Sequence, residues 1–244
     1  MEATIKLYPE IEEVLTDPLL ECYFRPLLTC NCERNVKNYK IHLLCFDGVF
    51  PDENRVVKYS EGGLFGFQYN NGVYKFLGDI KTLEHYDKIP VLYECLKADV
   101  IQHKDEYVDN KVPFSKYYNR LKGLIKKDFA FDTIDFYTEA FYSYEFTKYY
   151  YEKTGIHKHI SVLTENYGEN DDDFLLEEND ARNMLEEFFL NIQWNLKNNY
   201  DGFNIDMFCC AAECYRFMSL LGSFTIFGLL DEKNDIVYNL VYGS

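Results

Sequence analysis

The densest group of chemically active side chains in this sequence is a run of acidic residues between positions 161 and 190. This segment carries ten carboxylates against one base, Arg182, which amounts to nine of the sixteen net negative charges of the chain. We predict that a partner contacts seven of these acids: Glu169, Asp171, Asp172, Asp173, Glu177, Glu178 and Asp180.

Three interpretations of this run stay open from sequence. The acids form a docking patch for a basic partner, a site for a hard cation, or a solvated loop and helix turn whose charges complement the helix dipole. An EF-hand calcium loop is excluded, because residues 170–174 have neither the alternating ligands nor the glycine that such a loop needs.

A basic run precedes the acidic one. Six bases and no acid lie between residues 111 and 127, namely Lys111, Lys116, Arg120, Lys122, Lys126 and Lys127. They form a solvated helix face, a site for a phosphate-bearing ligand, or a surface that pairs with the acids in a homo-oligomer.

Carboxylates and histidines supply the candidates for catalysis. Asp128, Asp132, Asp135 and Glu139 recur at spacings of four, three and four, which on a helix lines up groups suited to magnesium or acid–base work, or only an exposed stripe. His157 and His159 share one side of a predicted strand. Together with Asp132 or Asp135 they would form the site of a hydrolase or transferase, which is the alternative to a binding protein.

A metal site or a nucleophile is not predicted. Two histidines begin a zinc site without completing it, and nothing in the sequence brings the Cys30/Cys32 pair or the Cys209, Cys210 and Cys214 cluster to them. The Gly-x-Ser-x-Gly elbow and the phosphate-binding P-loop are both absent, and residues 62–66 lead into a strand. No cofactor is predicted, and the sequence favours a protein that is not an enzyme.

The elements that must position these residues begin with strands. Residues 41–46 form an apolar run, and residues 64–69 and 73–77 face each other across Asn70-Asn71-Gly72, whose Asn-Gly pair suits a tight hairpin turn. A second hairpin is predicted from residues 224–230 and 236–241.

Helical patterns occupy most of the rest. We expect two short helices between residues 8 and 30, split near Asp17-Pro18. A longer helix follows Pro90, with apolar residues at Val91, Leu92, Cys95, Leu96, Val100 and Ile101. Further helices are predicted over 117–125, 132–153, 179–198 and 205–221. The predicted fold class is therefore α+β, mainly helical, with a small antiparallel sheet formed by hairpins near residues 40–78 and 224–242. The prediction is one domain over 1–244, with a weak boundary near 108–113.

Composition narrows the partners. The 244 residues include 41 acids and 25 Lys and Arg, a net charge of -16, which repels phosphate backbones and anionic lipids and so argues against nucleic acid and membranes as ligands. No secretory leader or apolar span is visible, and the eight cysteines lie in or beside apolar runs, as expected for reduced thiols in the cytoplasm.

These features together predict a function. Tyrosines on the helix predicted over 132–153 cannot all point inward, so some form an amphipathic boundary or contact a partner, and exposed tyrosine is typical of protein interfaces: Tyr142, Tyr144, Tyr149, Tyr150 and Tyr151. The hairpin segment 63–79 after the N-terminal helices resembles the immunity-protein families of bacterial toxin systems, and that resemblance implies an inhibitor of a protein partner. We therefore expect a non-catalytic, acidic protein-binding module with a basic protein as its partner.

Overall fold

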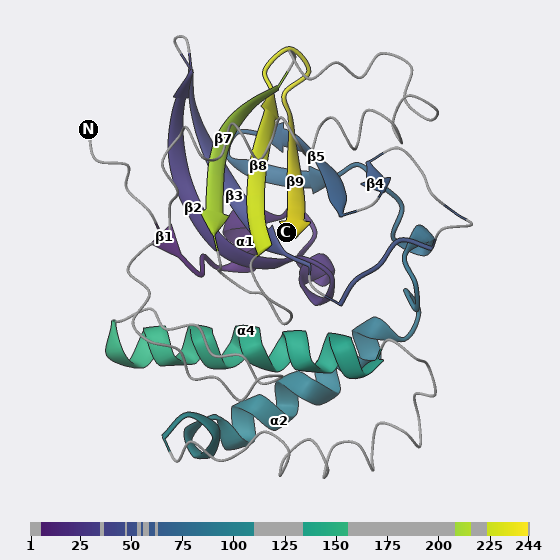
Figure 1. The fold of residues 1–244 in the computed structure, drawn as a ribbon, viewed down its shortest axis with the longest axis vertical. Coiled ribbons are helices and arrows are strands. Elements are labelled where there is room, and N and C mark those ends of the chain that lie inside the picture. The colour runs from purple at the N-terminus through teal and green to yellow at the C-terminus, as the bar shows by residue number, and fades with distance from the viewer. Residues whose placement is uncertain are drawn as a thin grey trace.

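The computed structural model describes residues 6–34, 37–46, 48–52, 55, 59–61, 63–109, 134–155, 208–215 and 224–243. Within these ranges, two antiparallel β-sheets lie on one side of the molecule and two long helices on the other (Figure 1). Because the two helices are stacked, the molecule has a sheet layer, a middle helix and an outer helix.

The first sheet comes from the N-terminal part of the chain. Its strands are β1 (Lys6–Leu7), β2 (Arg25–Arg34) and β3 (Lys37–Cys45), hydrogen-bonded in the order β1-β2-β3. β2 and β3 form a long hairpin whose register shifts between Pro26 and Leu28. Proline has no N–H to donate, so an irregular step in the ladder is expected beside it.

The second sheet joins distant parts of the sequence. Its order is β4-β5-β9-β8-β7, and β6 also pairs with β5; the strands are β4 (Ser60–Glu61), β5 (Leu64–Asn70), β6 (Val73–Phe76), β7 (Phe208–Tyr215), β8 (Phe224–Asp231) and β9 (Ile236–Gly243). β5 pairs with β9 over Leu64↔Leu240 to Gln68↔Ile236. This pairing unites the two predicted hairpins in one sheet.

Both predicted hairpins are confirmed. Asn71 and Gly72 lie between β5 and β6 with φ angles of 51° and 87°. Positive φ at both central residues is what a tight turn between twisted strands requires, and asparagine and glycine tolerate it best. β8 and β9 pair along their full length from Phe224↔Gly243 to Asp231↔Ile236.

Aromatic rings fill much of the core. The Phe24 ring makes edge or tilted contacts with Phe65, Phe67 and Phe76 at centroid distances of 5.1, 5.2 and 4.9 Å. The buried Asn239 of β9 connects the sheets, because its Oδ1 accepts from the Leu44 N–H of β3 at 2.9 Å. The sheets are thus held by apolar burial and by a polar bridge.

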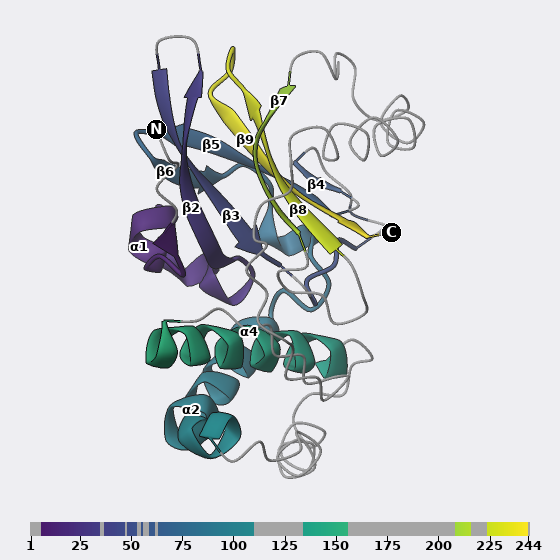
Figure 2. The same cartoon turned by 60° about the vertical axis from the view of Figure 1, so that its left-hand side comes forward.

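The helices lie beneath the sheets. The short elements are α1 (Ile11–Val14) and the 3-10 turns η1 (Pro18–Cys22) and η2 (Ile80–Thr82); the long helices are α2 (Ile89–Asp109) and α4 (Ile134–Thr154). α4 runs between the sheets and α2 in both views, so α2 is the outermost layer (Figures 1 and 2).

The predicted fold class is wrong in its balance. The chain is not mainly helical, because nine strands in two antiparallel sheets occupy the described residues. Residues 25–34 form β2 where the second short helix was expected, and residues 208–215 form β7 inside the helix predicted over 205–221. A short apolar run satisfies a buried strand and a buried helix equally well, and the pairing partners β3 and β8 decide the outcome.

Several other predictions are confirmed or stay open. The helices after Pro90 and over 132–153 are α2 and α4, and Gly155 ends α4 with a φ of 72°. The helices predicted over 117–125 and 179–198 lie outside the described residues. The single domain with a boundary near 108–113 stays a prediction. Among the described helices, none combines the length and the apolar character needed to cross a membrane.

Candidate functional site

One side of α2 is used by the fold. Leu92 and Leu96 are fully buried, and the Tyr93 ring stands edge-on to Phe141 of α4 at 5.5 Å. On the same helix pair, Tyr142 donates its hydroxyl to Asp99 at 2.6 Å. α2 is therefore attached to α4 by apolar packing and by a partly buried hydroxyl hydrogen bond.

The opposite side of α2 is apolar as well, yet it faces solvent. Val91 is 56% exposed and Ile101 is 68% exposed, and Cys95 and Ala98 are exposed beside them. Residues 91, 95 and 98 follow the i, i+4, i+7 spacing that places side chains in one row, and Ile101 lies one turn beyond Ala98. The polar side chain of Gln102 is exposed too and continues the row after Ala98. We call these five residues with Glu94, Asp105 and Glu106 the outer face of α2.

The charged residues of the outer face are all acidic. Glu94, Asp105 and Glu106 are exposed. Asp105 accepts a hydrogen bond from the Tyr149 hydroxyl, and Glu106 lies 3.4 Å from Nδ1 of His103. These contacts hold two of the carboxylates at the border of an apolar strip.

The two lysines of α2 turn away from this face. Lys97 reaches Glu21 of η1 at 3.1 Å and lies over the Tyr93 ring at 5.2 Å, while Lys104 lies over the Tyr149 ring of α4 at 4.6 Å. The cation–π contacts and the ion pair hold both ammonium groups at the flank of α2 beside η1 and α4, where 44% of the Lys97 side chain stays exposed. The outer face therefore has carboxylates and no cationic side chain among its eight residues.

The junction of η1 with α2 is strongly polar. Tyr93 donates its hydroxyl to Glu21 at 2.6 Å. Burial, and then the Glu21 carboxylate, raise the pKa of Tyr93 above its usual range, so it stays a donor. Partial burial lowers the pKa of Lys97, but the neighbouring Glu21, Glu94 and Glu145 carboxylates outweigh it, and the net pKa is raised. Lys97 therefore stays cationic.

Glu145 of α4 faces the same junction. Burial raises the pKa of its carboxyl, and the Glu21 carboxylate adds to the increase, whereas Lys148, Arg25 and Lys97 oppose it. The Glu145 carboxyl therefore keeps its proton to a higher pH than an exposed glutamate does.

Arg25, at the start of β2, joins the sheets to α4. The side chain is 1% exposed and its guanidinium lies 5.5 Å from the Tyr137 ring and 5.6 Å from the Tyr144 ring. The two tyrosine hydroxyls donate to the Cys22 and Pro26 carbonyl oxygens at 2.7 and 2.6 Å. This group is a structural joint, because these contacts link α4 to β2 and to the 3-10 turn before it.

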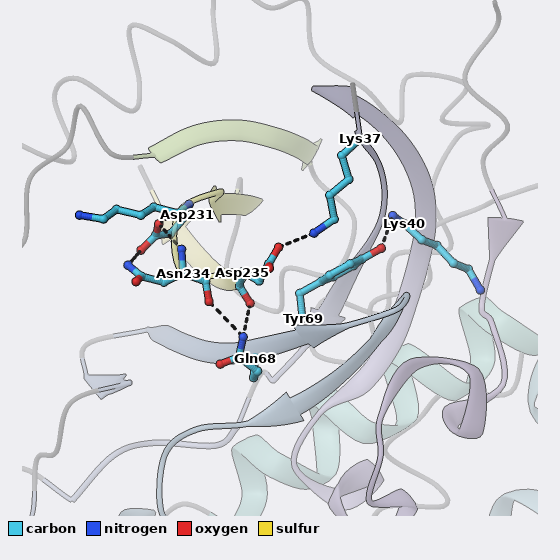
Figure 3. Close-up of polar contacts among 8 residues, drawn as sticks. Lys37, Lys40, Gln68, Tyr69, Asp231, Asn234 and Asp235 are labelled. Carbon is cyan, nitrogen blue, oxygen red and sulfur yellow. Dashed lines mark hydrogen bonds and ion pairs between the residues drawn. The ribbon is translucent and has the colours of Figure 1, made fainter. Parts of the chain in front are cut away.

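A second polar cluster lies at the tips of two hairpins (Figure 3). Lys37 Nζ lies 2.5 Å from Asp235 Oδ1, which links the β2–β3 hairpin to the β8–β9 hairpin. The Asp235 carbonyl oxygen accepts from Gln68 Nε2 and from the Tyr69 N–H, both at 2.7 Å, and Asp231 caps the same turn by accepting the Lys233 N–H. The cluster ties three strand segments together.

His42 and Thr29 form a hydroxyl–imidazole pair inside the first sheet. Gly72 has only a carbonyl oxygen to offer His42 Nε2 at 2.7 Å, so Nε2 carries the proton and Nδ1 accepts the Thr29 hydroxyl at 2.7 Å. Burial lowers the pKa of His42 to about 4. Because both side chains are buried, the pair holds the β5–β6 turn against β3 and is not open to a substrate.

The partner-binding residues predicted from sequence lie outside the described residues: Glu169, Asp171, Asp172, Asp173, Glu177, Glu178 and Asp180. The basic run over 111–127 lies outside them too. The pairing of the basic run with the acidic run in a homo-oligomer stays a prediction.

The candidates for catalysis are described only in part. His157, His159, Asp128 and Asp132 lie outside the described residues, whereas positions 135 and 139 both belong to α4. Cys209, Cys210 and Cys214 belong to strand β7 and not to a helix, so their predicted helical clustering is wrong. In the part of the chain that the structure describes, no three His, Cys, Asp or Glu side chains are placed to hold a metal ion.

Sequence reasoning missed the outer face of α2. The six apolar residues after Pro90 were treated as one stripe, but the structure buries Leu92, Leu96 and Val100 and exposes the other three. The sequence feature that could have revealed this face is the width of the apolar pattern around the helix. Residues 91 and 95 stand about 60 to 140° around the helix from 92 and 96, so one neighbouring helix is too narrow to cover both rows.

Comparison of the chain with protein-family models, with curated proteins and with solved structures finds no match.

Proposed function

We propose that this protein is a non-catalytic binding module for a basic protein partner, acting as an inhibitor of that partner. The observation that supports it best is the outer face of α2, where exposed aliphatic side chains lie among carboxylates and the lysines of the helix are turned inward. Exposed apolar residues that the fold does not need are typical of an interaction surface.

The overall charge supports the same function. A chain of net charge -16 attracts a cationic protein over several ångströms and speeds the encounter at low ionic strength. The seven acids between Glu169 and Asp180 supply a large part of this charge. We propose that they steer the partner toward the complex.

The site of action that we propose is the cytoplasm. The thiol of Cys22 is buried, as expected for a thiol kept reduced, which suits a reducing compartment.

The test begins by finding the partner. Native mass spectrometry of the untagged protein purified from its source gives the mass of a co-purifying protein. Its association rate is then measured by stopped flow over a salt series, with the native chain and with a variant carrying Asp171→Asn, Asp172→Asn, Asp173→Asn, Glu177→Gln and Glu178→Gln.

The proposal expects an association rate that falls steeply with salt and a slower, less salt-sensitive rate for the variant, because steering depends on net charge. A co-purifying partner that is itself acidic, or equal rates for both proteins at every salt concentration, contradicts the proposal.

A further inference from the structure

We propose that the outer face of α2 docks a basic amphipathic helix of the partner, with aliphatic side chains over the Val91-to-Ile101 strip and Lys or Arg beside the carboxylates. This inference rests on the proposed function and names its contact surface. A helix that lays its apolar side against an exposed apolar face is a recurrent mode of peptide recognition.

The length of the face fits such a ligand. Val91 to Asp105 is 15 residues, and its 14 steps of about 1.5 Å give about 21 Å, which is the length of a helix of about four turns. Ala98 is the small residue in the middle, between the larger Val91 and Ile101. A small central side chain lets the backbone of a second helix approach closely, while the flanking aliphatic groups pack beside it.

The charges select the chemistry of the ligand. Glu94 lies on the face one turn before Ala98, and Asp105 and Glu106 lie at its C-terminal end. An acidic helix meets repulsion here, and a second copy of this chain brings a further net charge of -16. A helix with Lys or Arg on both sides of its apolar strip satisfies both the apolar and the charged parts of the face.

The ammonium groups that would repel this ligand are held elsewhere. Lys97 is bound by Glu21 and Tyr93, and Lys104 lies against Tyr149. Glu21 and Tyr149 thus act as positioning residues for the surface, because they keep the two cations of α2 off its outer face.

The test uses two synthetic probes of 18 residues built from leucine and lysine. In one, the residues follow the helical period and form an amphipathic helix; in the other, the same residues are scrambled so that no apolar side forms. Binding to the full chain is measured by fluorescence anisotropy. Equal charge in both probes separates docking on an apolar strip from simple attraction to an acidic protein.

Three variants test where on the protein the amphipathic probe binds. Ile101→Ser removes an exposed aliphatic group, Glu94→Lys reverses a charge on the face, and Glu12→Lys makes the same charge change at an exposed position of α1 as the matched control. We expect about tenfold weaker binding of the amphipathic probe by Ile101→Ser, a similar loss for Glu94→Lys at low salt, and a change within about twofold for Glu12→Lys.

Cys95 supplies a readout that global binding cannot mimic. Its thiol is exposed on the outer face, so its alkylation by iodoacetamide, followed by peptide mass spectrometry, reports whether the face is covered. The amphipathic probe is expected to slow the reaction at saturation, and the scrambled probe to leave it unchanged.

Equal affinity for both probes, or unchanged binding by Ile101→Ser and Glu94→Lys, overturns the inference. The variant neutralised between Asp171 and Glu178 separates this result from failure of the proposed function. If that variant still associates with the native partner more slowly than the native chain does, the proposed function stands although the outer face of α2 is not the contact surface. Sedimentation of the chain alone supplies the remaining outcome: a dimer that Ile101→Ser dissociates overturns the basic partner as occupant of the face.

Discussion

Two cations in this protein are each flanked by two tyrosine rings, and they differ in what surrounds them. Arg25 lies between Tyr137 and Tyr144 and is 1% exposed, whereas Lys37 lies over Tyr39 at 4.5 Å and Tyr69 at 5.5 Å with 48% of its side chain exposed. The distances between cation and rings are similar at the two sites, but Arg25 is buried and Lys37 is exposed to solvent.

This difference in burial indicates which of the two contacts contributes more to the stability of the fold. In a buried site the dielectric is low, water does not compete, and the stem of the cation is part of the packing. At the exposed site, water and salt screen the pair between Lys37 and Asp235. The joint between sheets and α4 should therefore contribute far more to stability than the contact between the hairpin tips.

Truncation of Arg25 gives the largest expected effect. Arg25→Ala should lower the free energy of unfolding by about 3–5 kcal/mol, because it leaves a cavity and removes the cation from between two rings. Urea unfolding followed by tyrosine fluorescence measures it. The matched control is Lys37→Ala; equal losses for the two variants would mean that burial does not distinguish the two sites.

Lowering the pH should reduce the stability of the fold because His42 becomes protonated. Its pKa is lowered from about 6.5 in the unfolded chain to about 4 in the folded protein, so between these values only the unfolded state binds the proton. Stability is therefore fully present above pH 6.5 and falls by about 3 kcal/mol as the pH drops to 4.

The measurement is urea unfolding at half-unit steps of pH, with NMR of the imidazole ring as a direct check. A ring that already titrates at pH 6 in the folded protein would refute the assignment. His42→Gln should show a shallower loss of stability over the same range.

Loss of a single hydroxyl at the joint should have a smaller effect. Tyr144→Phe keeps the ring beside Arg25 and removes the donor to the Pro26 carbonyl, which is buried, so we expect a loss of about 1–2 kcal/mol. Thermal unfolding of this variant is compared with Tyr149→Phe, whose hydroxyl bond to Asp105 is exposed. A larger shift in Tm for Tyr149→Phe would reverse the ranking of buried over exposed contacts.

The hairpin-tip pair should have the smallest effect. Lys37→Met removes the ion pair with Asp235 and should change stability by less than about 1 kcal/mol at low salt. The difference from the native chain should vanish in 1 M NaCl, where the Debye length is about 3 Å. A loss that persists in high salt would show that ring packing and not charge carries the contact.

Local turn chemistry made parts of the fold predictable. Asn71-Gly72 needs no distant partner to favour a tight turn, and Gly155 stops α4 by its own backbone freedom. The strands β2 and β7 were not predictable in this way. Their ladders are supplied by β3 and β8, and an apolar run without its partner has no preferred period.

The candidate surface shows the same limit. The acidic residues of α2 and its apolar positions are visible in the sequence, but the choice of Leu92 and Leu96 as the buried row depends on the position of α4. Arg25 is a stronger case, because a charged residue predicts a solvated position, whereas the structure buries it against two tyrosine rings of α4 and the Cys45 sulfur.

By itself, the sequence determined the net charge, the two hairpins and the positions of α2 and α4, because charge is additive and turns and helices depend on neighbouring residues. Only the tertiary structure decided how many strands pair, which apolar row of α2 is covered and which cation is buried. These outcomes depend on contacts between residues far apart in the chain, where the free energy of burial is decided by the partner as much as by the residue itself.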